Sequence, residues 1–74
     1  MIKIRLLNVL ATKAGRSSAV LDAVPGLTVR DAIRDLELEE KWAQLVLLNG
    51  SIARLESELN DGDELTLSAL VGGG

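Results

Sequence analysis

Apolar and polar residues alternate at both ends of the chain. The segment 2–10 opens with apolar residues at every second position, separated by a lysine and an arginine, and the segment 64–71 alternates in the same way. A period of two is typical of a strand that buries one face. These segments therefore predict a first and a last strand, each with one apolar face.

Shorter patterned segments lie between these two ends. A polar stretch with one glycine over 11–18 predicts a loop, and 19–24 predicts a second short strand that the turn at Pro25-Gly26 ends. The apolar run 45–48 predicts another strand. The turn Asn49-Gly50 follows it and predicts a hairpin with a brief return strand.

One helix is predicted between these strands, and capping residues mark its start. Thr28 can act as the N-cap, and Asp31 three positions later completes a capping box. The apolar residues that follow at helical spacing are Val29, Ala32, Ile33 and Leu36. We expect this helix to end between residues 36 and 40, and the segment 37–43 has room for one more helical turn.

The predicted order of elements is strand, strand, helix, strand, short strand, strand. Because one helix covers only one face of a sheet, this order favours an α+β fold of the β-grasp, or ubiquitin-like, class. We expect a mixed sheet of four to five strands packed on one main helix, with the first and last strands central and parallel. A ferredoxin-like α+β fold is the alternative, and it needs a second full helix, which only 37–43 could supply.

Composition and charge exclude several classes of function. The chain has 74 residues, a net charge of −3 and no cysteine or histidine, which excludes thiol nucleophiles, Ser-His triads and the usual zinc ligands. Its 8 basic residues are scattered and Trp42 is the only aromatic residue, so we expect no nucleic-acid partner. No segment resembles a membrane span or a signal peptide, so we expect a cytoplasmic protein with no membrane partner.

The last residues of the chain are three glycines, Gly72, Gly73 and Gly74. Glycine has no Cβ, so such a strip can enter a narrow channel in another protein. We therefore interpret the chain as a domain over 1–71 followed by a flexible tail over 72–74. The alternative is a tail without chemistry, since terminal residues are often disordered.

Three turn motifs precede these glycines in a characteristic order. They are Gly26-Leu27-Thr28-Val29 at the start of the helix, Leu48-Asn49-Gly50 after the apolar run, and Asn60-Asp61-Gly62-Asp63-Glu64 before the last strand. The combination covers essentially the whole chain and resembles the ThiS/MoaD family of ubiquitin-like sulfur carriers. The Val-Gly-Gly-Gly ending is similar to thiamine-type carriers and the long first hairpin to molybdopterin-type carriers, so both pathways stay open.

The resemblance implies a carrier without catalytic residues or a bound cofactor or metal of its own. A partner adenylyltransferase, similar to ubiquitin-activating enzymes and holding the ATP and metal, would adenylate the Gly74 carboxylate while Gly72 and Gly73 enter its active site. A persulfide would then displace AMP and leave a thiocarboxylate. The sulfur acceptor would be a thiazole synthase or the large subunit of a molybdopterin synthase. In the second case this chain would be the small subunit of that synthase. A protein modifier joined to lysines through the same residue is the alternative.

The apolar run 45–48 also predicts a surface for such partners. If alternate residues of this run point into the core, Leu45 and Leu47 point outward, and Leu70 lies beyond the last buried residue. We expect these three leucines to form an apolar docking patch. The alternatives are that loops cover them, or that the chain is an interaction module without terminal chemistry.

Overall fold

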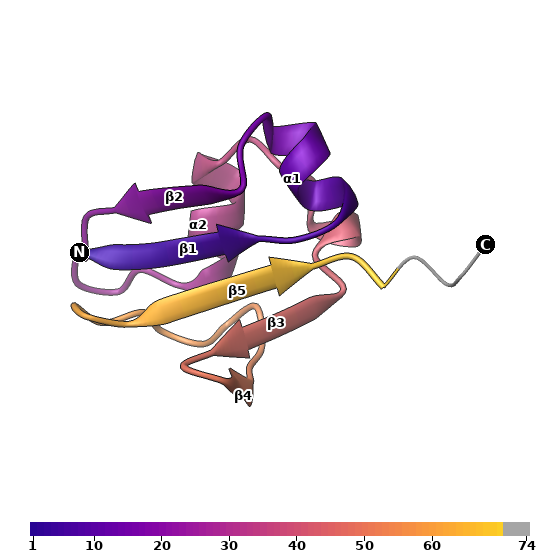
Figure 1. Ribbon diagram of the computed structural model, residues 1–74. Helices are drawn as coiled ribbons and strands as arrows, with labels where there is room; N and C mark the ends of the chain where they lie inside the picture. The colour runs from indigo at the N-terminus through magenta and orange to yellow at the C-terminus, as the bar shows by residue number, and fades with distance from the viewer. Residues whose placement is uncertain (71–74) are drawn as a thin grey trace.

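The fold consists of a five-stranded mixed sheet and short helices (Figure 1). It is seen in a computed structural model that describes residues 1–70, so the predicted domain end at residue 71 and the glycines 72–74 lie outside the described residues. In chain order the elements are β1 (Ile2–Leu6), α1 (Val9–Ala14), β2 (Ser18–Leu21), α2 (Val29–Asp35), the 3-10 helix η1 (Glu40–Trp42), β3 (Leu45–Leu48), β4 (Ser51–Ile52) and β5 (Glu64–Ser68).

The strands are arranged in the order β2-β1-β5-β3-β4, so the first and last strands lie side by side at the centre. β1 and β5 run parallel, and the other neighbouring strands are antiparallel. In Figure 1 α2 lies behind β1 and β2 and covers one face of the sheet. The predicted β-grasp architecture is therefore confirmed, whereas the ferredoxin-like alternative is wrong because 37–43 forms only the single turn η1.

The core lies between α2 and the covered face of the sheet. In β1 the three apolar residues are buried and the lysine and arginine between them are exposed, as the alternation predicts. The parallel register places Ile4 beside Leu65 and Leu6 beside Leu67, and these four side chains are at most 2% exposed. The alternating ends of the chain thus form the central layer of the core.

The start of α2 is set by residues that are close in sequence. The Thr28 N–H donates to Asp31 Oδ2 over 3.0 Å, and the Asp31 N–H donates to Thr28 Oγ1 over 3.3 Å. This reciprocal capping box satisfies N–H groups that have no partner within the helix. All four residues predicted for the apolar face of the helix are buried: Val29, Ala32, Ile33 and Leu36.

The segment 11–18 is not the loop that its polarity predicted. Helix α1 takes up its first part, and Leu10 of that helix is fully buried. Gly15 ends the helix with φ 75°, and its N–H donates to carbonyl groups of the last turn. Only one of the six residues of this helix is buried, so the sequence shows no apolar residues at helical spacing here. For this reason the helix was not predicted.

Three strands, β1, β2 and β5, end earlier than their patterns predicted, whereas β3 has the predicted bounds. β1 ends at Leu6 because α1 begins soon after it, and β5 ends at Ser68 rather than at residue 71. β2 ends at Leu21 rather than at residue 24, since the chain then turns toward α2, where the Leu27 N–H donates to the Val24 carbonyl. The hairpin of β3 and β4 has the predicted turn at Asn49-Gly50.

Candidate functional site

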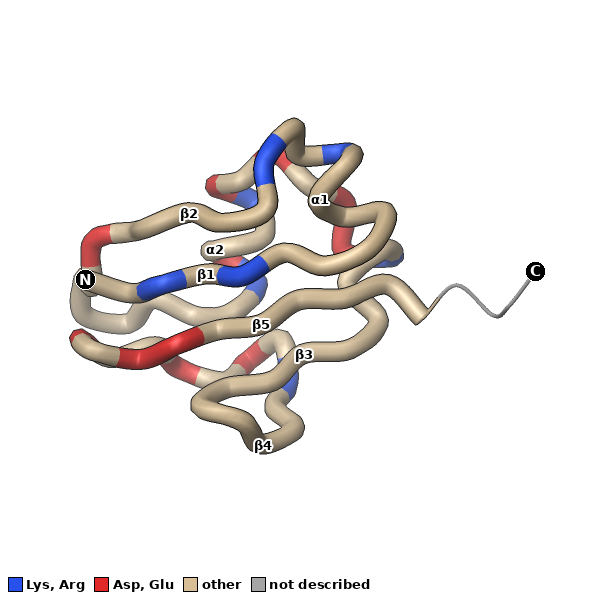
Figure 2. Tube along the Cα trace, viewed as in Figure 1, with Lys and Arg blue, Asp and Glu red and all other residues tan. Residues whose placement is uncertain are grey.

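The face of the sheet opposite α2 has a charged part and an uncharged part (Figure 2). On this face β1 carries Lys3 and Arg5, and β5 begins with Glu64. The rest of β5 and both strands beyond it contain no charged residue. The uncharged part of the open face therefore lies over β3, β4 and the end of β5.

The side chains of β3 alternate between the core and the open face as predicted. Val46 is buried and Leu48 packs against the core, so Leu45 and Leu47 lie on the open face. Both open-face leucines are half-buried, which means that neighbouring residues cover part of them but do not bury them. Their outward orientation is confirmed, and their role in docking stays a prediction.

Three more apolar side chains extend this surface. Leu70 lies just beyond β5 and is 61% exposed, as expected for the third predicted docking residue. Ile52 is 82% exposed and pairs with Leu47 across the β3–β4 hairpin. Leu7 is 39% exposed, and its N–H donates to the Leu67 carbonyl over 3.0 Å, which continues the pairing of β1 with β5.

We call these five residues the apolar patch: Leu7, Leu45, Leu47, Ile52 and Leu70. Leu7 and Ile52 were not predicted to belong to this surface, although the sequence contains a signal for each. Leu7 continues the outward-facing positions of β1, and a two-residue turn at Asn49-Gly50 places Ile52 opposite Leu47. Leu7, Ile52 and Leu70 are exposed and the other two are half-buried, and exposed apolar surface of this kind is typical of a face that binds another protein.

Asn8 fixes the chain where it leaves β5. Its Nδ2 donates to Ser68 Oγ over 3.0 Å and to the Ala69 carbonyl over 2.8 Å. The backbone of Asn8 has φ 54° and ψ −136°, a conformation that is costly for a residue with a Cβ and often marks a functional position. This contact joins the corner between β1 and α1 to the residues directly before Leu70, and sequence reasoning did not find it.

The two turn motifs at the other end of the sheet also contact each other. The Asn49 side chain donates to Asp63 Oδ1 over 2.9 Å and accepts from the Glu64 N–H over 2.9 Å. The Asn60 N–H donates to Asp63 Oδ2 over 2.8 Å. These hydrogen bonds, first that from Asn49 and then that from Asn60, lower the pKa of the Asp63 carboxyl. The motifs behind the family resemblance thus tie the β3–β4 turn to the start of β5.

Two features that would indicate another kind of function are not found in residues 1–70. In this range no cluster of three or more potential metal ligands is found. Over the same residues, no helix has the length and apolar character needed to cross a lipid bilayer. The predicted reacting residue Gly74, with Gly72 and Gly73 before it, lies outside the described residues.

Comparison with known protein families identifies the family of this chain. The model of the ThiS family matches residues 4–74, which confirms the predicted ThiS/MoaD resemblance. A search of curated protein sequences gave no significant match.

Solved structures share this fold over nearly the whole chain. SAMP1 from Haloferax volcanii has a TM-score of 0.79 and 28% identity over 99% of this chain and 98% of its own. A second structure of H. volcanii small archaeal modifier protein 1 has a TM-score of 0.72 and 29% identity over 89% of this chain and 92% of its own. A putative molybdopterin converting factor subunit 1 from Pyrococcus furiosus has a TM-score of 0.73 at 21% identity, covering 92% of this chain and 94% of its own, and it supports the fold alone.

Proposed function

The chain belongs to the ThiS family, and we propose that it is a ubiquitin-like sulfur carrier that reacts through the carboxylate of Gly74. The observation that carries this proposal is the extent of the family match, which runs from residue 4 through the three glycines to residue 74. The similarity to SAMP1 supports the same broad class of small carriers and modifiers.

The proposed chemistry begins with removal of the negative charge that makes a carboxylate a poor electrophile. On a partner adenylyltransferase, a carboxylate oxygen of Gly74 attacks the α-phosphorus of ATP, and pyrophosphate leaves. The terminal sulfur of a partner persulfide then attacks the carbonyl carbon and displaces AMP. A second thiol cleaves the sulfur–sulfur bond, which leaves a thiocarboxylate on Gly74 and a disulfide on the partner.

In this scheme the chain supplies the carboxylate and a surface that partners recognise. Since the sequence has no cysteine and no histidine, the persulfide and the thiol belong to partners, as do the ATP and its metal ion. Gly72 and Gly73 lie in the active site of the adenylyltransferase, where side chains would obstruct the channel. The sulfur acceptor is a synthase of cofactor biosynthesis, either a thiazole synthase or the large subunit of a molybdopterin synthase.

We assign docking of the adenylyltransferase to the apolar patch. Leu70 belongs to this patch and is two residues before Gly72, the first of the residues that enter the partner. A partner seated on Leu45 and Leu47 would therefore hold the end of the chain near its own nucleotide. The contact between Asn8 and Ala69 supports this arrangement, because it fixes the point from which the last residues depart.

Adenylation is tested with the purified chain, its adenylyltransferase and labelled ATP. We expect exchange of pyrophosphate with ATP only when the chain is present. The control is the chain without Gly73 and Gly74, which should keep the circular dichroism spectrum and the urea midpoint of the full chain. Equal exchange with the shortened chain would contradict the proposal.

A protein modifier is the second candidate function. It is favoured by the 28% identity to SAMP1, since the related structure is described as small archaeal modifier protein 1. In this case a lysine amine, rather than a persulfide, attacks the same adenylate or a thioester made from it, and an isopeptide bond forms. Lysine conjugates of the chain in its host, lost when Gly73 and Gly74 are removed, would support this function.

A further inference from the structure

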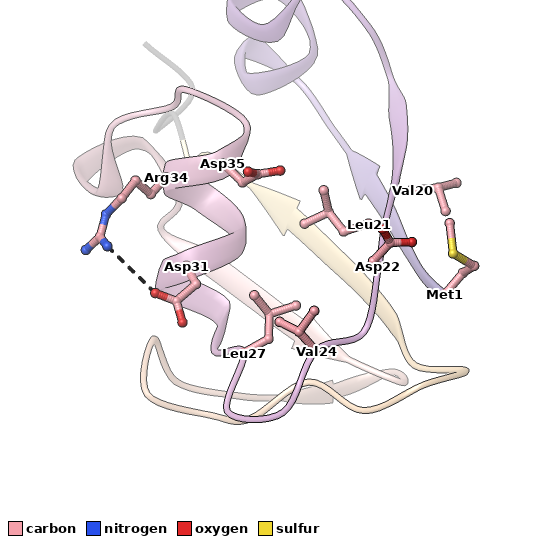
Figure 3. Close-up of a pocket in the computed structure, with 9 residues that line it drawn as sticks. All are labelled: Met1, Val20, Leu21, Asp22, Val24, Leu27, Asp31, Arg34 and Asp35. Atoms are coloured by element: carbon pink, nitrogen blue, oxygen red, sulfur yellow. Dashed lines mark ion pairs between the residues drawn. The ribbon is translucent and has the colours of Figure 1, made fainter.

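A groove of about 740 Å³ lies at the β2 edge of the sheet, between β2 and α2 (Figure 3). β2 and the β3–β4 hairpin are at opposite edges, so the groove is separate from the main part of the apolar patch. Its apolar lining includes Leu21 from β2, Val24 from the turn that follows, and Leu27, which lies just before the N-cap of α2. Val24 is 51% exposed, so apolar surface remains open to an incoming side chain.

The outer edge of β2 offers free main-chain groups beside this groove. The Leu6 N–H donates to the Ser17 carbonyl over 2.9 Å. Because hydrogen-bonded and non-hydrogen-bonded residues alternate along an antiparallel pair, this bond shows which residues of β2 are bonded to β1. With this register, the main-chain N–H and C=O groups of Ala19 and Leu21 hydrogen-bond to β1. Those of Ser18 and Val20 point away from the sheet. β2 contains no lysine or proline, the residues that commonly block an exposed edge.

The rim of the groove is acidic. Asp22 follows β2, and Asp31, Arg34 and Asp35 come from α2. The Arg34 guanidinium lies 3.8 Å from Asp31, whereas within residues 1–70 neither Asp22 nor Asp35 has an ion-pair partner. In Figure 3 the carboxylate of Asp35 points toward β2 across the groove. The rim therefore favours a positively charged ligand.

We propose that this groove binds an extended, basic segment of a partner protein by strand addition to β2. The segment pairs its main chain with Ser18 and Val20 and inserts alternate apolar side chains between β2 and α2. Lysine or arginine residues that flank the apolar positions lie near Asp22 and Asp35. The proposal does not depend on the chemistry of Gly74, and the groove can be occupied while an adenylyltransferase is seated on the opposite half of the sheet.

The probe is a short synthetic peptide in which valine and threonine alternate between two lysines at each end. It is titrated into the full-length, isotope-labelled chain and followed by amide NMR shifts. We expect the largest shifts at Ser18, Val20, Leu27 and Asp35, with little change at Leu45 or Leu47. A matched peptide with glutamate in place of lysine should bind at least about fivefold more weakly at low salt, because its flanking charges repel the rim.

Two variants separate main-chain pairing from charge. Val20→Pro removes an outward N–H while leaving the bonds to β1, and it should weaken binding about threefold to tenfold. The double variant Asp22→Lys, Asp35→Lys should reverse the preference, so that the glutamate peptide binds more tightly than the lysine peptide. The proposal is overturned if the shifts fall on the apolar patch, if neither peptide shifts β2 or α2, or if the charge reversal leaves the preference unchanged.

Discussion

The side-chain amide of Asn8 donates a hydrogen bond of 2.8 Å to the carbonyl of Ala69, 61 residues further along the chain. A second bond from the same nitrogen reaches Ser68 Oγ. Ser68 and Ala69 are almost completely buried whereas Asn8 is exposed, so these bonds are partly shielded from water. The corner after β1 thus determines where the last described residues leave the sheet.

Replacement of Asn8 should destabilise the fold. We expect Asn8→Ala to lower the free energy of unfolding by about 2 kcal/mol, since two hydrogen bonds are lost and alanine is strained at positive φ. Asn8→Gly loses the same bonds but relieves the backbone, so it should be more stable than Asn8→Ala. Urea unfolding measures both values. Equal stability of the alanine variant and the wild type would show that the contact contributes nothing.

The same pair of variants tests the role of this contact in function. If Asn8 positions the end of the chain, both variants should slow adenylation under conditions in which each is fully folded. The glycine variant is the informative one because its backbone is unstrained. An unchanged adenylation rate in Asn8→Gly would show that the contact of Asn8 contributes to stability alone and not to adenylation.

Substitution in the apolar patch should affect docking rather than folding. Ile52→Glu changes a side chain that is 82% exposed, so the free energy of unfolding should stay within about 0.5 kcal/mol of the wild type. If Ile52 is central to the interface, the KM for the chain in the adenylyltransferase assay should rise about 30-fold. Val24→Glu is the matched control at the opposite edge, and it should leave this KM unchanged. Equal effects of the two variants would argue against docking on the patch.

The hydrogen bonds to Asp63 should make stability depend on pH. Because they lower the pKa of this carboxyl in the folded state, their stabilisation is full above the ordinary value of 3.8. It is lost as the pH falls through the lower pKa of the folded protein. We therefore expect the free energy of unfolding to decrease in acid, and Asp63→Asn to show a smaller decrease. Urea titrations at a series of acidic pH values measure this, and parallel curves for the two proteins would contradict it.

The capping box of α2 gives a prediction about stability alone. Thr28→Ala should lower the free energy of unfolding by about 1 kcal/mol because the Asp31 N–H loses its acceptor. Thr28→Ser keeps the hydroxyl and should lose much less. Thermal unfolding distinguishes the two variants, and equal losses would assign the effect to the methyl group of Thr28.

The sequence predicted those features that depend on nearby residues. Thr28 and Asp31 are three positions apart, and the alternation in β1 and β5 needs no knowledge of the partner strand. The contacts of Asn8 with Ser68 and of Asn49 with Asp63 depend on which strands become neighbours, and no local pattern contains that information. Helix α1 was not predicted because Leu10 is its one fully buried residue, and the core residues that surround Leu10 are distant in sequence.

The candidate site was predicted in part for the same reason. Leu45 and Leu47 followed from alternation within β3, and Leu70 followed from its place just beyond β5. Leu7 and Ile52 joined them only through the pairing of β1 with β5 and of β3 with β4. The groove beside β2 was not predicted, since it is formed by β2 and α2, and no local pattern shows that these two elements pack side by side.

Intact-mass spectrometry of the chain from its native host is the measurement that tests the central claim most directly. Sulfur transfer to Gly74 predicts a form heavier by the replacement of one oxygen atom with one sulfur atom, and fragmentation should place this change at Gly74. The form should disappear when the partner adenylyltransferase is deleted. A chain that carries only oxygen at Gly74, in cells where the adenylyltransferase and its sulfur donor are active and the sulfur acceptor has been removed, would contradict the account.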